Sequence, residues 1–183
     1  MTLEVVPLSQ DRRRDFWSIH APQHGEGWCC CVAWWVPTWE GWGERAAIEN
    51  RRLREELFDR GELDLYLLLE DGAPVGSCQC GPRDRLAKLV AQYRLAPDPE
   101  VWALSCFVLA PSARGRGLAR TFLAGILDDL ARRGVRHVQA FPKRGTGLEA
   151  GEVWTGPEAL FRGAGFTVER DDPARPVYGV RLA

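Results

Sequence analysis

Apolar and polar positions recur with two different periods along this 183-residue chain. Short apolar runs of strand length are separated by segments in which apolar residues return about every three or four positions, as on one face of a helix. The clearest run, VWALSCFVLA at 101–110, is almost continuously apolar and predicts a central strand covered on both faces. This alternation predicts an α/β (α+β) domain built around one mixed sheet.

The same pattern predicts six to seven strands flanked by about four helices. Strands are expected at 2–6, 64–70, 75–80, 102–109, 135–141 and on both sides of a turn at 171–176. Helices are expected at 11–19, 44–60, 118–133 and 157–162, with one or two further helical turns near 86–93. Asp71-Gly72 predicts a tight hairpin between the second and third strands. The inward side of the 44–60 helix is expected to carry Ala47, Ile48, Leu53 and Leu57.

A glycine- and arginine-rich loop, PSARGRGLA at 111–119, joins the 102–109 strand to the helix that follows. A turn of this kind at a helix N-terminus presents several unpaired main-chain N–H groups in one direction, and the helix dipole adds partial positive charge there. Arg114, Arg116 and Arg120 add full positive charges nearby. The loop therefore predicts a phosphate-binding site, suited to a pyrophosphate or a ribose phosphate.

The spacing within this loop excludes two common nucleotide motifs. The Gly-Lys-[Ser/Thr] ending of a P-loop is absent, and the third glycine of a G-x-G-x-x-G fingerprint is replaced by Arg120. The remaining pattern is R-x-x-G-x-A, formed by Arg114, Gly117 and Ala119. The residues alone leave open a second interpretation, an arginine- and glycine-rich helix start on the surface without a ligand.

The R-x-x-G-x-A loop, after an apolar strand and a proline, resembles the acetyl-CoA-binding motif of the GNAT acetyltransferase superfamily. The C-terminal order of helix, Gly165-Phe166, strand, turn and strand is similar to the end of the same superfamily. The remainder resembles an uncharacterised GNAT subgroup with an N-terminal Cys-x-Cys-x-x-Trp segment. The matching positions are Cys29, Cys31 and Trp34; Pro74-Val75-Gly76; Gly81-Pro82-Arg83; Val101, Trp102, Cys106 and Phe107; Thr155, Gly156 and Phe161; and Ala164-Gly165-Phe166.

This resemblance implies a single domain over residues 1–183 with the GNAT acyltransferase fold. The sheet would be mixed and twisted, with a splay between the fourth and fifth strands that admits the pantetheine arm of acetyl-CoA as co-substrate. Main-chain groups of the fourth strand would pair with pantetheine, and the loop would hold the pyrophosphate. The implied cofactor contacts are Phe107, Val108, Leu109, Arg114, Gly115, Arg116, Gly117, Leu118, Ala119 and Phe161.

The implied reaction is direct attack on the thioester by a primary amine of a small molecule or peptide. Relatives often carry a glutamate on the strand before the loop and a tyrosine four residues before the glycine of Gly-Phe. Here residues 101–109 contain no carboxylate, and Phe161 occupies the tyrosine position. Cys106 is a candidate catalytic thiol, with a buried core thiol as the alternative. An acyl-CoA-binding sensor or partner module without turnover remains a second hypothesis for the whole protein.

The acceptor amine is expected to meet the loops at 20–43 and 143–156. Cys29, Cys31, Trp34 and Trp39 are the candidate acceptor contacts, and five tryptophans in 20–43 could form an apolar or cation-binding wall. Alternatively, the tryptophans plug a sheet edge or a subunit interface. The cysteines lack the C-x₂-C spacing of common zinc sites, so no metal is expected, although a metal or redox protein is a third hypothesis.

Charge and hydropathy limit the classes of partner that the protein is expected to bind. The chain has 24 basic and 25 acidic residues, which gives no overall field for nucleic acid or an anionic membrane surface. No window approaches about 18 uninterrupted apolar residues, and the N-terminus lacks the order of a signal peptide. We therefore expect a cytoplasmic protein with no nucleic-acid or membrane partner. The exposed aromatic residues also allow a homodimer.

Overall fold

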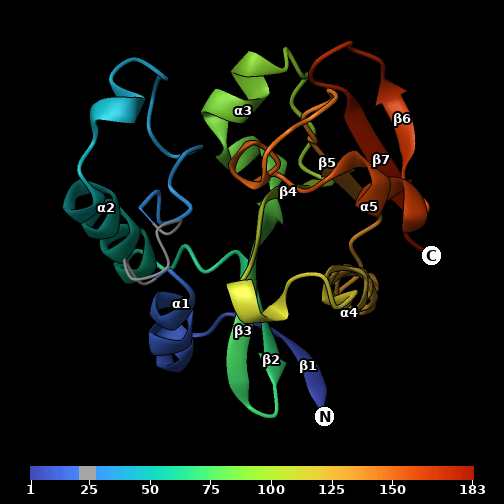
Figure 1. The fold of residues 1–183 in the computed structure, drawn as a ribbon. Coiled ribbons are helices and arrows are strands. Elements are labelled where there is room, and N and C mark those ends of the chain that lie inside the picture. Colours follow the sequence, from blue (N-terminus) through green and yellow to red (C-terminus); the bar gives the residue numbers. More distant parts are fainter. Residues whose placement is uncertain (21–27) are drawn as a thin grey trace.

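Over residues 1–20 and 28–183, which the computed structural model describes, seven strands form one mixed sheet (Figure 1). The strand order across the sheet is β1-β2-β3-β4-β5-β7-β6. The strands are β1 Leu3–Pro7, β2 Leu65–Glu70, β3 Ala73–Pro82, β4 Val101–Leu109, β5 His137–Ala140, β6 Thr167–Arg170 and β7 Val177–Arg181. The helices are α1 Arg13–Ile19, α2 Ala47–Asp59, α3 Ala87–Gln92, α4 Leu118–Arg132 and α5 Glu158–Gly163.

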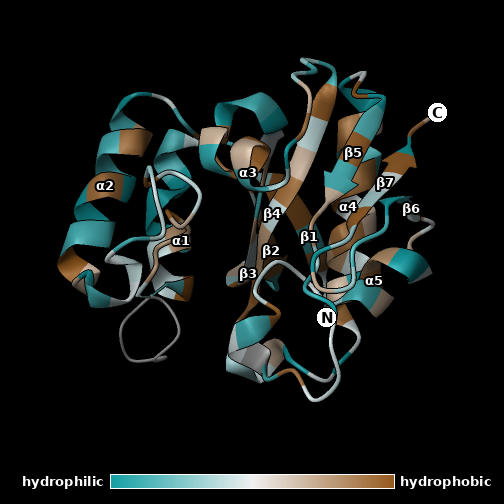
Figure 2. Cartoon of the chain, turned by 90° about the horizontal axis from the view of Figure 1, so that it is seen from above, coloured by the Kyte–Doolittle hydropathy of each residue, from teal (hydrophilic) through white to brown (hydrophobic). Residues whose placement is uncertain are grey.

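Helices cover both faces of the sheet, with α1 and α2 on one side and α4 and α5 on the other (Figure 2). Strand β2 shows why, because all of its residues from Leu65 to Leu69 are buried and their side chains alternate between the faces. Leu65 and Leu67 pack with the α1 and α2 side chains Phe16 and Phe58. Tyr66 and Leu68 belong instead to the core with the apolar stripe of α4, formed by Leu118, Phe122, Leu123, Ile126 and Leu130.

The apolar pattern predicted most elements correctly but assigned the wrong face to the start of α2. Leu57 is fully buried as expected, whereas Ile48 is 64% exposed and Ala47 also lies on the surface. The buried side of the helix carries Asn50 and Arg54, at 0% and 1% exposure. This inward face is therefore partly polar, which the hydropathy of the helix alone does not indicate.

The polar side chains of α2 are buried because they bind main-chain oxygens of the segment 28–31. Asn50 Nδ2 donates to the oxygen of Trp28 at 3.0 Å, and Arg54 Nε donates to that of Cys30 at 3.0 Å. Arg54 Nη2 also donates to the oxygen of Cys31. Such bonds offset the cost of removing a guanidinium from water. Helix α2 thus fixes the loop that approaches the centre of the sheet.

Strand β5 pairs in parallel with only the first four residues of β4. Residues 101–104 pair with 137–140, and β4 then continues for five residues beyond the end of this pairing. On its other side β4 has a bulge against β3, since Cys106 lies opposite Gln79 while Leu104 lies opposite Cys80, which leaves Ser105 as the extra residue. The expected splay is confirmed, and we call the region beside residues 105–109 of β4 the wedge.

The turn between β2 and β3 has the conformation that its two residues favour. Asp71 and Gly72 adopt φ angles of +47° and +81°, as a two-residue hairpin turn of type I′ requires, which confirms the predicted hairpin. Cys78 and Cys80 are fully buried and pack in the core on the α4 side of the sheet. In the described ranges, no helix combines the length and apolar character needed to cross a membrane.

Candidate active site

The loop after β4 has the geometry expected of an anion site. Residues 111–113 form one turn of 3₁₀ helix, and α4 begins at Leu118. Gly115 and Gly117 have φ angles of +69° and +78°, which L-residues rarely adopt. A β-carbon built on either glycine meets no atom of the described residues within 4 Å, so these residues leave the space beside both open. Glycine is therefore needed here for the backbone conformation, and it leaves room for a ligand against the main chain.

Five consecutive main-chain N–H groups, from Gly115 to Ala119, have no acceptor among the described residues. The flanking groups are paired, because the N–H of Ala113 donates to the oxygen of Ala110 and that of Arg120 to the oxygen of Gly117. The unpaired donors lie at the N-terminus of the 15-residue helix α4, where the helix dipole favours negative charge. We call the loop 111–119 the cradle; its donors suit a diphosphate.

The three arginines of the cradle region are not equivalent. Arg116 forms a two-point ion pair with Glu70, with contacts of 2.5 and 3.0 Å, and this hydrogen bonding lowers the pKa of the carboxyl group. Arg114 Nε donates to the oxygen of Leu109 at 3.0 Å. The exposed side chain of Arg120 has no partner within the described ranges. Arg120 is thus the member of the three whose charge is uncommitted.

The wedge edge of β4 is already contacted by the 143–156 loop. The N–H of Phe107 donates to the main-chain oxygen of Trp154 at 2.8 Å. The N–H of Ala110 donates instead to Val75 in β3, and main-chain groups alternate along a strand. Phe107 and Leu109 therefore turn their main-chain groups to the wedge, and Val108 turns its own to β3. The sequence did not single out Trp154, since a main-chain acceptor leaves no mark in side-chain type.

Two of the four candidate acceptor residues contact β4 at its bulge. The indole N–H of Trp34 donates to the oxygen of Ser105 at 3.1 Å, and the sulfur of Cys31 lies 3.1 Å from that of Cys106. Trp39 lies farther out, 38% exposed, and its indole donates to the Gln92 side chain. Cys29 is half-buried beside them. The structure thus brings Cys31, Trp34 and Cys106 together, while Cys29 and Trp39 lie at the periphery.

A histidine that the sequence did not single out as a site residue adjoins this cluster. His20 follows α1, is 3% exposed, and its Nε2 lies 2.9 Å from Ser77 Oγ and 3.5 Å from the sulfur of Cys31. Its Nδ1 is buried and has no hydrogen-bond partner within residues 1–20 and 28–183. No group of three or more potential metal-ligating side chains occurs in the part of the chain that is described. The position of His20 at the end of an amphipathic helix was the available sequence signal for a role at the sheet.

Phe161 occupies the core rather than a surface of the wedge. Its ring is fully buried, lies 5.4 Å from the ring of Phe166, and sits so close to Gly156 that a β-carbon there would be 2.5 Å from Cζ. A tyrosine hydroxyl at this position would extend from that same Cζ atom toward Gly156. The Phe161 side chain therefore packs beneath the 143–156 loop, and its expected cofactor contact stays a prediction.

All three tyrosines of the chain are engaged in hydrogen bonds. The hydroxyl of Tyr66 donates to Asp129, and that of Tyr178 donates to Glu158 at 2.5 Å. Tyr93 interacts with the guanidinium of Arg175, although burial is the main cause that raises the pKa of this phenol. An uncommitted phenol of the kind that relatives use as a general acid is thus not present in the ranges described.

A cavity of about 470 Å³ lies beside the cradle, between the end of α1 and the loop that leaves β4. Its lining residues are Ser18, Ile19, Pro74, Val75, Ala110, Pro111 and Ser112. Two of these residues, Pro111 and Ser112, belong to the cradle, and Ala110 directly precedes it. A ligand bound at the cradle therefore has adjoining space on the α1 side of the sheet.

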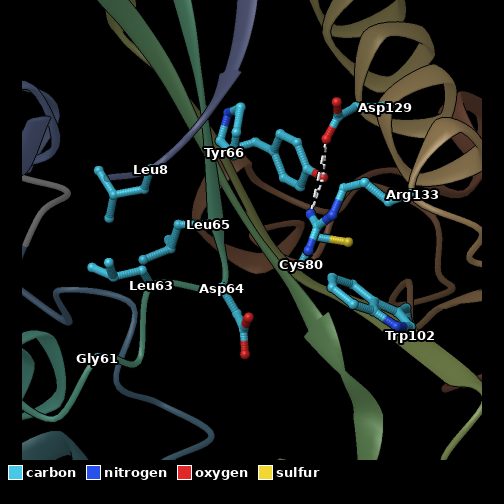
Figure 3. Close-up of a pocket in the computed structure, with 11 residues that line it drawn as sticks. Leu8, Gly61, Leu63, Asp64, Leu65, Tyr66, Cys80, Trp102, Asp129 and Arg133 are labelled. Carbon is cyan, nitrogen blue, oxygen red and sulfur yellow. Dashed lines mark hydrogen bonds and ion pairs between the residues drawn. The ribbon is translucent and has the colours of Figure 1, made fainter. Parts of the chain in front are cut away.

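A second cavity, of about 400 Å³, lies at the other end of α4 (Figure 3). Arg133 and Asp129 both bond the hydroxyl of Tyr66 at 2.8 Å, and the Arg133 guanidinium lies 4.8 Å from the centre of the Trp102 ring. A helix of 15 residues is roughly 22 Å long. This cavity is therefore remote from the cradle, and its polar side chains are paired: Tyr66, Asp129 and Arg133 with one another, and Asp64 with Arg85.

Solved structures of several acetyltransferases share this fold at low sequence identity. The PaiA N-acetyltransferase of Thermoplasma acidophilum, in complex with coenzyme A, matches all of both chains with a TM-score of 0.58 and 15% identity. The YncA protein of Salmonella typhimurium, with acetyl-CoA, gives 0.59 and 15% over 100% of this chain and 95% of its own. The ribosomal-protein-S18-alanine N-acetyltransferase of Escherichia coli gives 0.55 and 12%, with coverage of 100% and 95%.

The sequence comparison is more specific. No curated protein sequence matches the chain. The profile of the acetyltransferase (GNAT) family, however, matches residues 16–146, which is more than half of the chain and includes β4, the cradle and α4. The chain belongs to the acetyltransferase (GNAT) family.

Proposed function

We propose that this protein is an acetyl-CoA-dependent N-acetyltransferase that transfers the acetyl group to a primary amine of a small molecule or peptide. The observation that carries the proposal is the row of five main-chain N–H groups at the start of α4, Gly115 to Ala119, for which the described part of the chain supplies no acceptor. They suit a diphosphate, and acetyl-CoA contains one. Coenzyme A or acetyl-CoA is present in two of the structures that share the fold.

Acyl transfer to an amine requires removal of a proton, because an amine with a pKa near ~10 is protonated at neutral pH. In this proposal His20 accepts that proton, directly or through water. It lies on the α1 side of the sheet and contacts Ser77, whose partner in β4 is Val108. The strand offers no carboxylate for this purpose.

The negative charge that develops on the thioester oxygen requires a hydrogen-bond donor. In this proposal the N–H of Phe107, on the wedge edge of β4, provides it. That group is bonded to the oxygen of Trp154, so the 143–156 loop must move by a small amount before the donor is released. Loop movement and cofactor entry are then coupled steps. With the tyrosines engaged elsewhere, water protonates the departing thiolate.

A second candidate function is an acyl-CoA sensor without turnover, and the contact between Trp154 and Phe107 favours it. Calorimetry with acetyl-CoA, followed by thiol release across a panel of primary amines, separates the two functions. Binding with amine-dependent thiol release supports the transferase. Binding with no thiol release for any amine supports the sensor, and absence of binding contradicts both.

A further inference from the structure

Two cysteines from distant parts of the chain face each other beneath the bulge of β4. The sulfur atoms of Cys31 and Cys106 are 3.1 Å apart, although 75 positions separate the residues in sequence. Both side chains are buried, at 2% and 3% exposure. A disulfide has an S–S length of roughly 2.05 Å, so the two sulfurs are about 1 Å from bonding distance. The two sulfurs are therefore in direct contact across the boundary between the segment 28–36 and the sheet.

Neighbouring contacts hold the two sulfurs in this arrangement. Arg54 donates to the main-chain oxygens of Cys30 and Cys31, and Trp34 donates to that of Ser105, next to Cys106. The φ angles of Cys30 and Cys31 are +45° and +52°, an unusual backbone conformation for residues with side chains. The segment is thus fixed on both sides of the sulfur pair. Bond formation requires side-chain rotation rather than a rearrangement of the fold.

We propose that Cys31 and Cys106 form a reversible disulfide that fastens the segment 28–36 to β4 when the protein meets a hydroperoxide. The Cys31 thiolate attacks the peroxide oxygen, which gives a sulfenic acid and releases water or alcohol. The sulfur of Cys106 then displaces the sulfenic oxygen as a second water, and the S–S bond forms. Two thiols lose two electrons and two protons in total, and the peroxide accepts both pairs.

Two basic groups favour Cys31 as the attacking residue. Nε2 of His20 lies 3.5 Å from its sulfur and can take the thiol proton. The buried guanidinium of Arg54 lies against the same segment and has no carboxylate ion-pair partner among the residues described. A thiolate formed here therefore lies beside positive charge, which stabilises it.

The reaction is expected to be slow and selective. The hydrogen bond with Cys106, and then burial, raise the pKa of the Cys31 thiol well above its usual range. Burial likewise raises the pKa of Cys29 to about 12 and that of Cys30 to about 11. The low acidity of Cys29, Cys30 and Cys31 makes each of them slow to react at neutral pH, so the proximity of the sulfurs of Cys31 and Cys106 determines which bond forms. Disulfides of cytosolic proteins are commonly transient, as this one would be.

The consequence for catalysis rests on the proposed function. The segment 28–36 contains the candidate acceptor contacts Cys31 and Trp34, so fastening it to β4 would restrict the approach of the amine. We expect the oxidised protein to release thiol from acetyl-CoA at least about fivefold more slowly than the reduced protein, and dithiothreitol to restore the rate.

The test treats the full-length protein with hydrogen peroxide, blocks remaining thiols with iodoacetamide and maps the digested peptides without reduction. A Cys31–Cys106 cross-link that dithiothreitol reverses is expected, together with a rise in Tm of roughly 10 °C, since a loop of this size loses much unfolded-state entropy. Cys31→Ser and Cys106→Ala should each abolish both signals. Cys29→Ser, on the same segment, should retain them.

Oxidation that stops at sulfenic or sulfinic acid, or that links any other pair of cysteines, would overturn the proposal. Cys106→Ser provides a second variant where Cys106→Ala lowers the yield of folded protein. The cross-link is read by mass and by Tm, without acetyl transfer. Reduced protein that releases no thiol with any amine contradicts the proposed function, whereas reduced protein that is active but never cross-links contradicts this inference alone.

Discussion

The indole N–H of Trp34 donates to the main-chain oxygen of Ser105 at 3.1 Å, which joins the segment 28–36 to the bulge of β4. Both partners are buried, so the oxygen has no access to water in place of the indole. Trp34 also packs against Trp154, with ring centres 5.6 Å apart. One side chain therefore connects the acceptor-side segment, the bulge and the loop that borders the wedge.

Trp34→Phe is expected to destabilise the protein by about 1–3 kcal/mol, because it keeps an aromatic ring but leaves the Ser105 oxygen without its donor. Urea unfolding of the reduced protein measures this difference. Trp39→Phe is the matched control, since Trp39 is 38% exposed and its partner Gln92 can bond water instead. Equal losses for the two variants would contradict a special role of the contact with Ser105.

Gly117→Glu is expected to reduce acetyl-CoA affinity by more than about tenfold. The glutamate fills the space at the cradle, and its negative charge repels the negatively charged diphosphate. The φ of +78° adds a folding cost of about 1–2 kcal/mol for any L-residue. Gly134→Glu is the control. Gly134 has a φ of +81°, and a β-carbon built there meets none of the described atoms within 4 Å, but the residue follows the other end of α4. Calorimetry should show near-normal affinity for the control. If both variants lost acetyl-CoA affinity to a similar extent, backbone strain alone would explain the loss in Gly117→Glu.

His20→Gln is expected to lower kcat by about 100-fold with a much smaller change in the KM for acetyl-CoA, because glutamine can bond Ser77 but cannot accept the proton of an ammonium group at neutral pH. Steady-state thiol release with the preferred amine measures both constants. The loss of kcat should be smaller with amines of lower pKa, because these amines are already deprotonated at neutral pH. A uniform deficit across amines would show that His20 acts through structure.

Much of this fold follows from local sequence, and so does the cradle. The apolar runs determine the strands, and Asp71-Gly72 determines a hairpin turn, because each signal depends on residues that are close along the chain. The cradle could be recognised from sequence because its two glycines, Gly115 and Gly117, directly precede the helix whose N-terminus they expose. Features of this kind need no information about distant partners.

The acceptor side was harder to predict because its contacts are long-range and partly main-chain. Arg54 faces inward because it bonds carbonyl groups more than twenty positions away. The hydropathy pattern of the helix, in which a charged residue counts as exposed, could not indicate this. His20 bonds Ser77 across 57 positions. The oxygen of Trp154 reaches Phe107 whatever the side chain is. Such contacts become visible only when the fold brings the segments together.

The ammonium group of Lys88 is surrounded by the rings of Trp34, Trp39 and Trp42. The group is 3.4 Å from the centre of the Trp39 ring, within 6 Å of those of Trp34 and Trp42, and donates to the oxygen of Thr38 at 3.3 Å. The side chain is 8% exposed, and burial, followed by repulsion from Arg45, lowers the pKa of Lys88 to about 8. The protonated lysine is thus costly to bury near neutral pH.

This depressed pKa predicts a pH-dependent stability that Lys88→Met removes. Between about pH 8 and the ordinary lysine pKa of 10.5, the unfolded chain binds more protons at this position than the folded protein does. The free energy of unfolding of the wild type should therefore rise with pH across this window, relative to that of Lys88→Met, and the difference should be constant below about pH 7. Urea unfolding of both proteins at several pH values, under reducing conditions, cancels the contributions of the cysteines and tyrosines that they share. A difference independent of pH from 7 to 10.5 would mean that Lys88 keeps its ordinary pKa, with cation–π attraction to Trp39 balancing the cost of burial.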